Sequence, residues 1–285
     1  MNDQFEWDDS IKTLYQSSLA IFEVRFLATM NLQIEGMEPA FRGRLGLKLK
    51  QSWCLYDDFR HASCPDCHLL DHCHYVNLFT PDIRDSESAN QRRKQIRPFV
   101  FKIEASNGSE KLLKGESGSI EFCLFGPGIH LTPFFAKSAC EAIETFPMKV
   151  TAISSITPKF PEFHGRSDSG SGSSGSWKLD DFLEPSISSG NFLSAHFATP
   201  VHILSNGKAL NKENISFKHL MLSIIYRLRD LKRCYGNDTD MGKIPGDFSE
   251  VAGEVKIVLN RLYWSRRKRF SRRQEQDIWL NGLKA

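Results

Sequence analysis

The 285-residue sequence contains no apolar run near the roughly 20 residues that a membrane-spanning helix needs. Its first residues, MNDQFEWDDS, are acidic, whereas a secretory signal begins with a basic segment. The sequence also lacks the phosphate-loop pattern G-x-x-x-x-G-K-[ST], the metalloprotease pattern H-E-x-x-H and the hydrolase pattern G-x-S-x-G. No carboxylate cluster suggests a two-metal nuclease. These absences predict a protein with no membrane partner and exclude several large enzyme classes.

The composition is that of a soluble globular protein, with 40% hydrophobic and 25% charged residues. There are seven cysteines, an odd number, and four of them cluster before residue 75. This usage favours metal binding in a reducing compartment over a disulfide framework. We therefore expect a cytoplasmic protein.

Charge is distributed unevenly along the chain. From Arg261 to the end there are eight Lys/Arg and two Asp/Glu, a net charge of +6, while the whole chain carries only +3. The first 260 residues therefore carry −3. An anionic partner is expected to meet the basic end rather than the average.

The clustered cysteines are Cys54, Cys64, Cys67 and Cys73, and the middle two form a C-x-x-C pair. Four thiolates can complete a closed tetrahedral zinc site, and a two-residue gap lets one turn point two sulfurs at one metal. The spacing predicts a structural zinc knuckle over residues 54–79. Free thiols, disulfides, or a site in which a histidine replaces one cysteine are the alternatives. A closed four-thiolate site leaves no open position for catalysis.

Hydrophobic periodicity predicts several elements. Residues 21–28 alternate as a half-buried strand, and residues 41–50 form a helix with Phe41, Leu45 and Leu49 on one face. Two glycines in that helix, Gly43 and Gly46, indicate close approach of another backbone or a ligand. Strands are expected at 99–104 and 119–125, and helices at 132–146, 216–236 and 248–260.

The caps and faces of those later helices are also predicted. Thr132 is expected as the N-cap before Pro133, and Ser216 as the cap of the long helix that ends at Gly236. The inward face of the long helix is Phe217, Leu220, Met221, Ile224, Ile225, Leu228 and Leu231. The inward face of the 248–260 helix is Phe248, Val251, Ala252, Val255 and Val258.

The serine- and glycine-rich stretch SDSGSGSSGS at 167–176 is typical of a flexible linker. It predicts an N-terminal domain over 1–155, a linker over 156–190 and a C-terminal domain over 191–285. In the C-terminal domain, residues 192–198 are expected to form a strand, and Asn206-Gly207 a tight turn.

Basic and aromatic residues alternate near the C-terminal end. Arginines bind phosphates and stack on bases, and aromatic rings give bases a stacking surface. This run favours nucleic-acid binding over a merely solvated cationic surface. Its members are Arg261, Tyr263, Trp264, Arg266, Arg267, Lys268, Arg269, Phe270, Arg272 and Arg273. Arg42, Arg44 and Lys48, on the first helix, form either a second RNA contact or a solvated face.

Several motifs, in this order, resemble one family: the CRISPR-associated RNA-processing endoribonucleases of the RAMP superfamily, of the Cas-six type. They are FRGRLG at 41–46, the cysteine block ending in C-x-Y-x-x-x-F at 54–79, RPFV at 97–100 and LFG at 124–126. FATPVHI at 197–203 and the run from Trp264 to Gln274 complete the resemblance. The cysteine block is found in a subset of this family.

The resemblance implies an α+β fold of two tandem ferredoxin-like (RRM-related) domains, with the zinc knuckle inserted in the first. It also implies an endoribonuclease that binds CRISPR repeat RNA and cuts the precursor transcript without a catalytic metal. In that reaction a ribose 2′-hydroxyl attacks the adjacent phosphate and leaves a 2′,3′-cyclic phosphate. The chemistry requires a general base, a general acid and cations for the developing negative charge.

The sequence departs from the family pattern in two places. Many members carry a catalytic histidine near the turn before the first helix, but residues 31–39 contain none, so the general base is unassigned and His61 is the nearest substitute. The family also usually continues with a glycine-rich loop and further strands beyond the region matching WLNGL. We therefore expect an incomplete second domain, from a truncated or degenerate member or from one domain of a larger CRISPR adaptation fusion protein.

Two alternatives to a repeat-RNA endoribonuclease remain open. One is a catalytically inactive RNA-binding subunit or adaptor that works with other CRISPR-associated proteins. The other is an unrelated nucleic-acid-binding module held together by zinc.

Overall fold

The computed structural model describes residues 18–80, 96–156, 177–178, 194–195, 197, 200–235, 246–271 and 276–284. The chain is an α+β protein with two compact units. The sheet unit comprises Tyr15–Leu183 and Leu231–Thr239, and the ribbon unit comprises Met1–Leu14, Glu184–Asp230 and Asp240–Ala285. Among the helices in the described ranges, none has the length and apolarity needed to cross a membrane.

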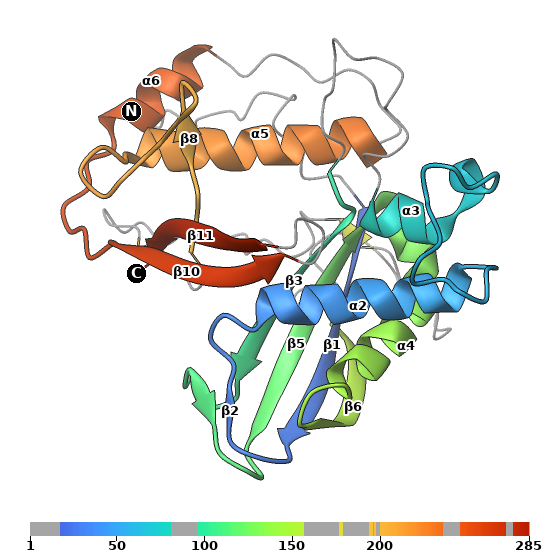
Figure 1. Cartoon of the computed structure of the whole chain (residues 1–285). Coiled ribbons are helices and arrows are strands. Elements are labelled where there is room, and N and C mark those ends of the chain that lie inside the picture. The colour runs from blue at the N-terminus through green and yellow to red at the C-terminus, as the bar shows by residue number, and fades with distance from the viewer. Residues whose placement is uncertain are drawn as a thin grey trace, which may run out of the picture. The chain divides into compact units, whose positions relative to one another are not determined.

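The sheet unit contains a four-stranded antiparallel sheet, two long helices and several short elements (Figure 1). The strands are β1 (Ser18–Ala28), β2 (Leu32–Gln33), β3 (Phe99–Ala105), β4 (Lys111–Leu112), β5 (Ser117–Phe125), β6 (Met148–Ile156) and β7 (Trp177–Lys178). The helices are α2 (Glu38–Trp53), α3 (His74–Phe79) and α4 (Thr132–Ile143), with short 3-10 turns η1 (Leu70–His72) and η3 (Gly126–Leu131).

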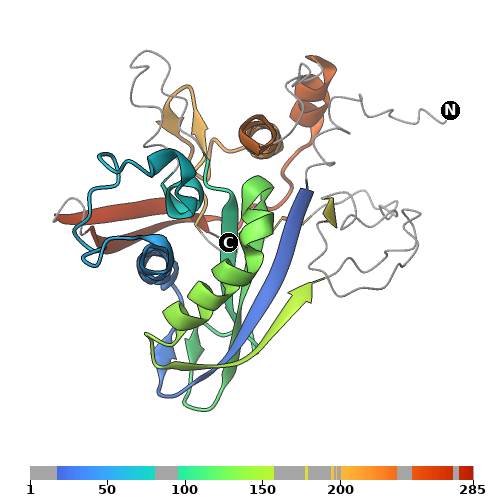
Figure 2. The ribbon, with the colours of Figure 1, turned by 90° about the vertical axis from the view of Figure 1, so that its right-hand side faces the viewer.

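The sheet has the strand order β3-β5-β1-β6, and β7 pairs with the start of β1. Each adjacent pair is antiparallel. The strand order places β1 between β5 and β6, two strands that come much later in the chain. One long helix follows the first strand and the other follows the third. Both lie against the same face of the sheet (Figure 2), and the side chains of that face form the core with them.

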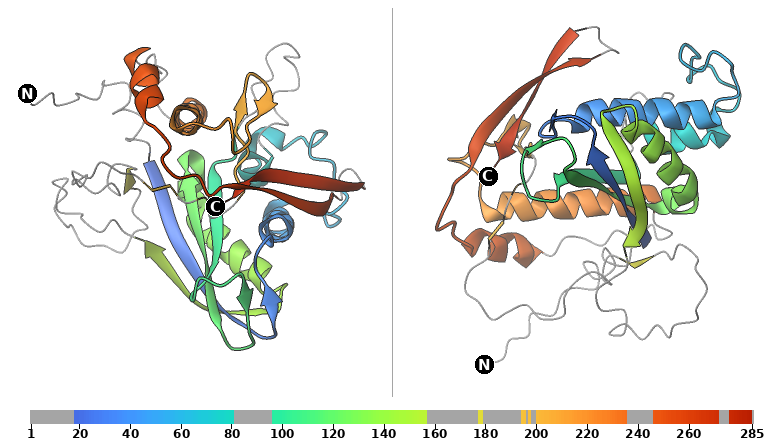
Figure 3. Two further views of the ribbon diagram at one scale, coloured as in Figure 1. Left: turned by 90° about the vertical axis from the view of Figure 1, so that its left-hand side faces the viewer. Right: turned by 90° about the horizontal axis from the view of Figure 1, so that it is seen from below.

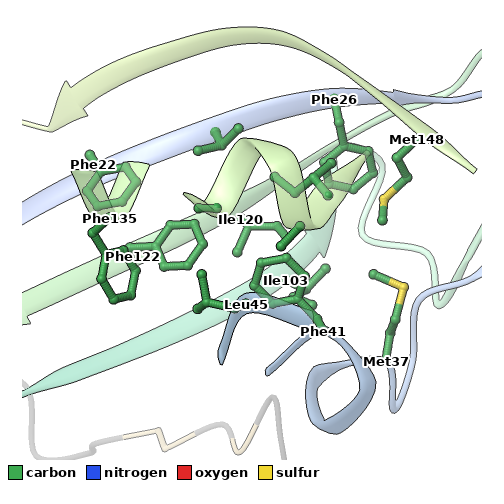
Figure 4. Packing of buried hydrophobic residues seen from close by; sticks show 14 of the residues in the cluster. Phe22, Phe26, Met37, Phe41, Leu45, Ile103, Ile120, Phe122, Phe135 and Met148 are labelled. Atoms are coloured by element: carbon green, nitrogen blue, oxygen red, sulfur yellow. The ribbon is translucent and has the colours of Figure 1, made fainter. Parts of the chain in front are cut away.

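The core of the sheet unit lies between that face and the two helices. Phe22, Val24 and Phe26 are buried, as the alternation in β1 predicts, while Arg25 is exposed. In Figure 4, Phe41 and Leu45 project from α2 toward the sheet. Rings dominate this packing, with Phe22 stacked on Phe122 at 4.8 Å between centroids and Phe135 meeting both edge-on. The predicted strands at 99–104 and 119–125 and the helix face with Leu49 are confirmed.

The prediction that Thr132 caps α4 is wrong. The helix begins at Thr132 itself, after Leu131 as N-cap, with no side-chain cap. The Thr132 hydroxyl instead donates to the Ile129 carbonyl oxygen at 2.6 Å, because a six-residue 3-10 turn runs directly into the helix. The helix also ends at Ile143, three residues before the predicted end.

In the ribbon unit, the described residues form two helices and two hairpins. The helices are α5 (Phe217–Tyr235), whose last turn belongs to the sheet unit, and α6 (Gly246–Glu254). The hairpin strands are β8 (Leu204–Ser205) with β9 (Lys208–Ala209), and β10 (Tyr263–Ser271) with β11 (Gln276–Lys284). A small core of Ile203, Leu210, Ile215 and Leu283 joins them.

Turn and cap chemistry in the ribbon unit agrees with the sequence. Asn206 and Gly207 both have positive φ, 50° and 75°, as a two-residue hairpin turn requires. The backbone N–H of His219 donates to the Ser216 hydroxyl at 3.4 Å, so Ser216 caps α5 as predicted. Gly236, the predicted stop, lies outside the described residues, but α5 does end at Tyr235.

The burial predicted for these helices is only partly right. Of the seven residues on the predicted face of α5, only Ile225 and Leu231 are buried, and Ile224 is 43% exposed. Helix α6 begins at Gly246 and stops at Glu254, so the predicted extension to residue 260 is wrong. Phe248 and Ala252 are buried as predicted. Val251 is exposed although it lies within α6, while Val255 and Val258 are exposed because the chain leaves the helix after residue 254.

Two further expectations concern the middle of the chain. The residues described within 192–198 are 194, 195 and 197, and none of them is in a strand, so a strand over that whole segment is wrong.

Strand β6 was missed, because MKVTAISSI has mainly small or polar residues. Only Met148 of that strand is buried, and most of its other residues are exposed.

Candidate nucleic-acid interface and cysteine pocket

All four clustered cysteines line one cavity of about 280 Å³, which we call the cysteine pocket. The C-terminus of α2 supplies the first, where the backbone N–H of Cys54 donates to the Lys50 carbonyl oxygen at 2.8 Å. A turn supplies the next two, with the Cys67 N–H donating to the Cys64 carbonyl oxygen at 3.2 Å. Cys73 follows η1 and precedes α3. Short-range backbone turns thus collect residues that are up to 19 positions apart.

The thiols are half-buried, unpaired by disulfides and close enough to affect one another. Burial raises the pKa of Cys64; the Lys50 ammonium opposes this, and Cys73 and Cys54 add to it. Burial, followed by the charges of the cysteines, raises the pKa of Tyr75 to about 12. A negative charge on one sulfur therefore disfavours a charge on the next, and a cation in the pocket would remove that conflict.

The four cysteines line one cavity, but their side chains are not arranged around one position that a metal ion could occupy. Within the described ranges, no three histidine, cysteine, aspartate or glutamate side chains stand in a metal-holding arrangement. The donor set nevertheless fits zinc, because thiolates are its preferred ligands in structural sites. His68, His72 and His74 also line the pocket, so the exchange of a histidine for a cysteine remains possible chemically.

The segment after the pocket is fastened to the sheet unit by a stack of rings. Tyr75 stacks on Phe79 at 5.7 Å, and Phe79 stacks on Phe99 at 5.9 Å. The Arg97 guanidinium lies 5.8 Å from the Phe79 ring, and its Nε donates to the Phe79 carbonyl oxygen at 2.7 Å. Glycine is the only residue type that fits at position 46, beneath the Phe79 ring, because a Cβ there would lie 2.4 Å from the Phe79 Cζ. The close approach predicted for Gly46 is thus made by a side chain.

The three basic residues predicted on α2 lie in different surroundings. The Arg42 guanidinium lies 5.7 Å from the rings of both Phe79 and Phe99. Lys48 Nζ is 3.9 Å from a carboxylate oxygen of Glu141, and Arg44 is exposed. Arg42 therefore takes part in the ring stack, and Arg44 is the member of the set that faces solvent.

His61 lies on an exposed turn between α2 and the C-x-x-C pair. Its Nδ1 is 3.0 Å from both carboxylate oxygens of Asp58, and the two side chains are 84% and 72% exposed. His61 does not line the cysteine pocket. An Asp–His pair of this kind orients the ring and leaves Nε2 available to exchange a proton.

The basic run at the C-terminal end forms β10, half of a long two-stranded ribbon (Figure 3). The Arg266 guanidinium lies 4.2 Å from the centroid of the Trp279 ring on the opposite strand. Tyr263, Trp264 and Trp279 are 50%, 43% and 49% exposed. The ribbon thus presents rings and a guanidinium to solvent, which are the groups that stack on unpaired bases.

The remaining predicted RNA contacts are placed only in part. The backbone of Arg267, Lys268 and Arg269 lies in β10, where Lys268 pairs with Trp279. Arg261 is exposed just before the strand, while Arg272 and Arg273 lie outside the described residues. The sequence analysis missed Trp279, although a second nine-residue segment after the basic run could have suggested a hairpin partner.

The ribbon is anchored at its base by one short backbone contact. Val201 and Leu283 exchange two hydrogen bonds, each 2.8 Å from nitrogen to oxygen. Gly282 permits this approach, because a Cβ there would lie 2.9 Å from the Val201 carbonyl oxygen. The residues FATPVHI and WLNGL, separate in sequence, therefore meet in the structure.

Comparison with known proteins gives a limited result. A family model described as "AF_1859_N: N-terminal domain" matches residues 18–148. That span runs from the first residue of β1 to the first residue of β6 and includes the cysteine pocket. No curated protein matches the chain.

Proposed function

We propose that this chain is a repeat-RNA-binding endoribonuclease of the Cas-six type, acting in the cytoplasm on CRISPR precursor transcripts. The observation that carries the proposal is the solvent-facing pair of Arg266 and Trp279 on the ribbon, whose strand β10 carries two further exposed rings, Tyr263 and Trp264. A guanidinium stacked on an indole can bind a phosphate through its charge. At the same place, the indole gives a base a ring on which to stack.

The topology of the sheet unit supports this proposal. Its order β3-β5-β1-β6, with helices after the first and third strands of that sheet, is the order of a ferredoxin-like domain. RRM-type RNA-binding modules share that plan. We propose that the ribbon unit belongs to a second domain of the same kind.

The proposed reaction needs a group that removes the proton from a ribose 2′-hydroxyl. His61 is the candidate, because the Asp58 carboxylate can hold its Nδ1–H and leave Nε2 as the acceptor. A cation of the same unit, such as Arg44, would balance the charge that develops on the phosphate. The exposure of His61 favours a second candidate function, an RNA-binding subunit or adaptor of a CRISPR complex without catalysis, since general bases usually work away from bulk water.

A cleavage assay separates these two functions. A labelled repeat RNA is incubated with the protein in EDTA, and the metal content of the protein is measured before and after. Site-specific cuts with cyclic-phosphate ends, absent when the ribose at the cut site is 2′-deoxy, support the endoribonuclease. Tight binding of the same RNA with no cut supports the adaptor. H61A should abolish the cut and preserve binding.

A binding assay tests the ribbon. Stacking contributes roughly 1–3 kcal/mol per base, so W279A should weaken RNA binding roughly 5- to 150-fold. R266A should weaken binding and lower the salt dependence by about one counterion. K137M, at an exposed position of α4, is the control and should bind normally. Normal binding by both ribbon variants would remove the ribbon from the interface.

We also propose that the cysteine pocket holds one structural zinc ion through Cys54, Cys64, Cys67 and Cys73. Zinc there would supply only cross-linking, while the chain's own turns present the thiols. Metal analysis of the purified protein should find one zinc ion per chain. C67S should lose it, and C140S, which removes a half-buried thiol from α4, should retain it. A folded protein without zinc contradicts the proposal.

A further inference from the structure

The cysteine pocket is lined by one lysine and no arginine. Of the residues that line it, Lys50 is the lone lysine or arginine. Its Nζ donates a hydrogen bond of 2.8 Å to the Ala62 carbonyl oxygen, two residues before the C-x-x-C pair. Its own carbonyl oxygen accepts from the Cys54 N–H at 2.8 Å. Lys50 thus bonds both to Cys54, at the end of α2, and to Ala62, in the turn that leads to the C-x-x-C pair.

The segment that carries the cysteines is acidic. Residues 54–79 contain four aspartates, Asp57, Asp58, Asp66 and Asp71, and a single arginine, Arg60. Zinc with four thiolates adds two further negative charges. Burying such a centre without a counter-charge is costly, because the low dielectric strengthens every repulsion. The half-buried Lys50 ammonium lies on the pocket wall, close enough to Cys64 to oppose the rise that burial causes in the pKa of that thiol.

We infer that Lys50 is a positioning residue of the zinc centre. Its ammonium compensates the excess negative charge of the four thiolates, and its bond to the Ala62 carbonyl oxygen fixes the turn that presents Cys64. This inference rests on the zinc site proposed above. It also links metal occupancy to the last turn of α2, the helix that carries Arg44.

Residues in the outer shell of metal ligands typically contribute about 10- to 100-fold in metal affinity. K50M keeps the apolar stem of the side chain but loses the charge and the donor. In the full-length protein, its zinc affinity should fall about 10- to 100-fold, measured by competition with a chromophoric chelator. K50Q retains a donor without charge and should fall by a similar factor, whereas K50R should remain close to the parent. K137M should bind zinc as the parent does.

The cobalt-substituted protein gives a second readout. Four-thiolate sites show strong sulfur-to-cobalt absorption, which K50M should retain at saturating cobalt while releasing the metal faster. K50Q with parental zinc affinity would overturn the role of charge. K50M with parental affinity would overturn the inference as a whole while leaving the zinc site intact. A parent protein that binds no zinc would overturn both.

Discussion

The two glycines of α2 allow a matched test of how the segment after the cysteine pocket is fastened to the sheet unit. A Cβ at Gly46 would lie 2.4 and 2.5 Å from two ring atoms of Phe79, whereas nothing lies within 4 Å of a Cβ at Gly43. The Phe79 ring cannot simply move aside, because Tyr75 and Phe99 stack on it. The same substitution should therefore affect stability differently at two positions three residues apart.

The expected magnitudes follow from helix propensity and packing. Glycine-to-alanine changes in a helix interior stabilise by roughly 1 kcal/mol, so G43A should raise the free energy of unfolding by about that amount. At Gly46 the same gain is opposed by overpacking, which costs typically 1–3 kcal/mol. G46A should then be neutral to about 2 kcal/mol destabilising. The two variants should differ by roughly 1–3 kcal/mol.

Urea unfolding followed by circular dichroism measures this difference. The double variant G46A/F79A provides the control, because removing the ring removes the clash. In the F79A background, G46A should become stabilising by about 1 kcal/mol, as G43A is in the parent. If G46A stabilises the parent as much as G43A does, the ring stack does not constrain α2 and the reasoning fails.

Two more predictions concern stability. Burial, with Glu121 nearby, raises the pKa of the Cys123 thiol to about 12 from its usual 9.0. Between those pH values the thiol ionises in the unfolded chain but not in the folded protein, so stability should fall as pH rises. Urea midpoints measured across that range should fall less steeply in C123A than in the parent. Replacing Ser216 with alanine removes the acceptor for the His219 N–H and should cost about 0.5–2 kcal/mol in thermal or urea unfolding, and an unchanged stability would show that α5 needs no cap.

Local patterns in the sequence predicted the sheet unit well. The alternation around Phe22 and Phe122 and the helical spacing of Leu45 correctly identified buried faces, because a single sheet face and a single helix face report directly on burial. The alternation failed for β6, where only Met148 is buried and no apolar face exists to be seen.

The ribbon unit was harder to predict. The apolar positions of α5 have helical spacing, but spacing shows only which residues share a face, and Ile224 on that face is 43% exposed. The basic run was recognised from its residue types, whereas the pairing of Arg266 with Trp279 depends on strand register across a turn. The cysteine pocket was foreseeable, since short turns collect its thiols, but the part played by Lys50 requires the fold of the following turn.

The position of β1 in the sheet sets the order in which the molecule can assemble during synthesis. Its partners begin only at Ser117 and Met148, so the first strand must wait, unpaired, while most of the sheet unit is made. The cysteine pocket closes over the much shorter span from Lys50 to Val76 and can form first. With zinc bound there as proposed, a shortage of zinc in the cell would lower the yield of folded chains.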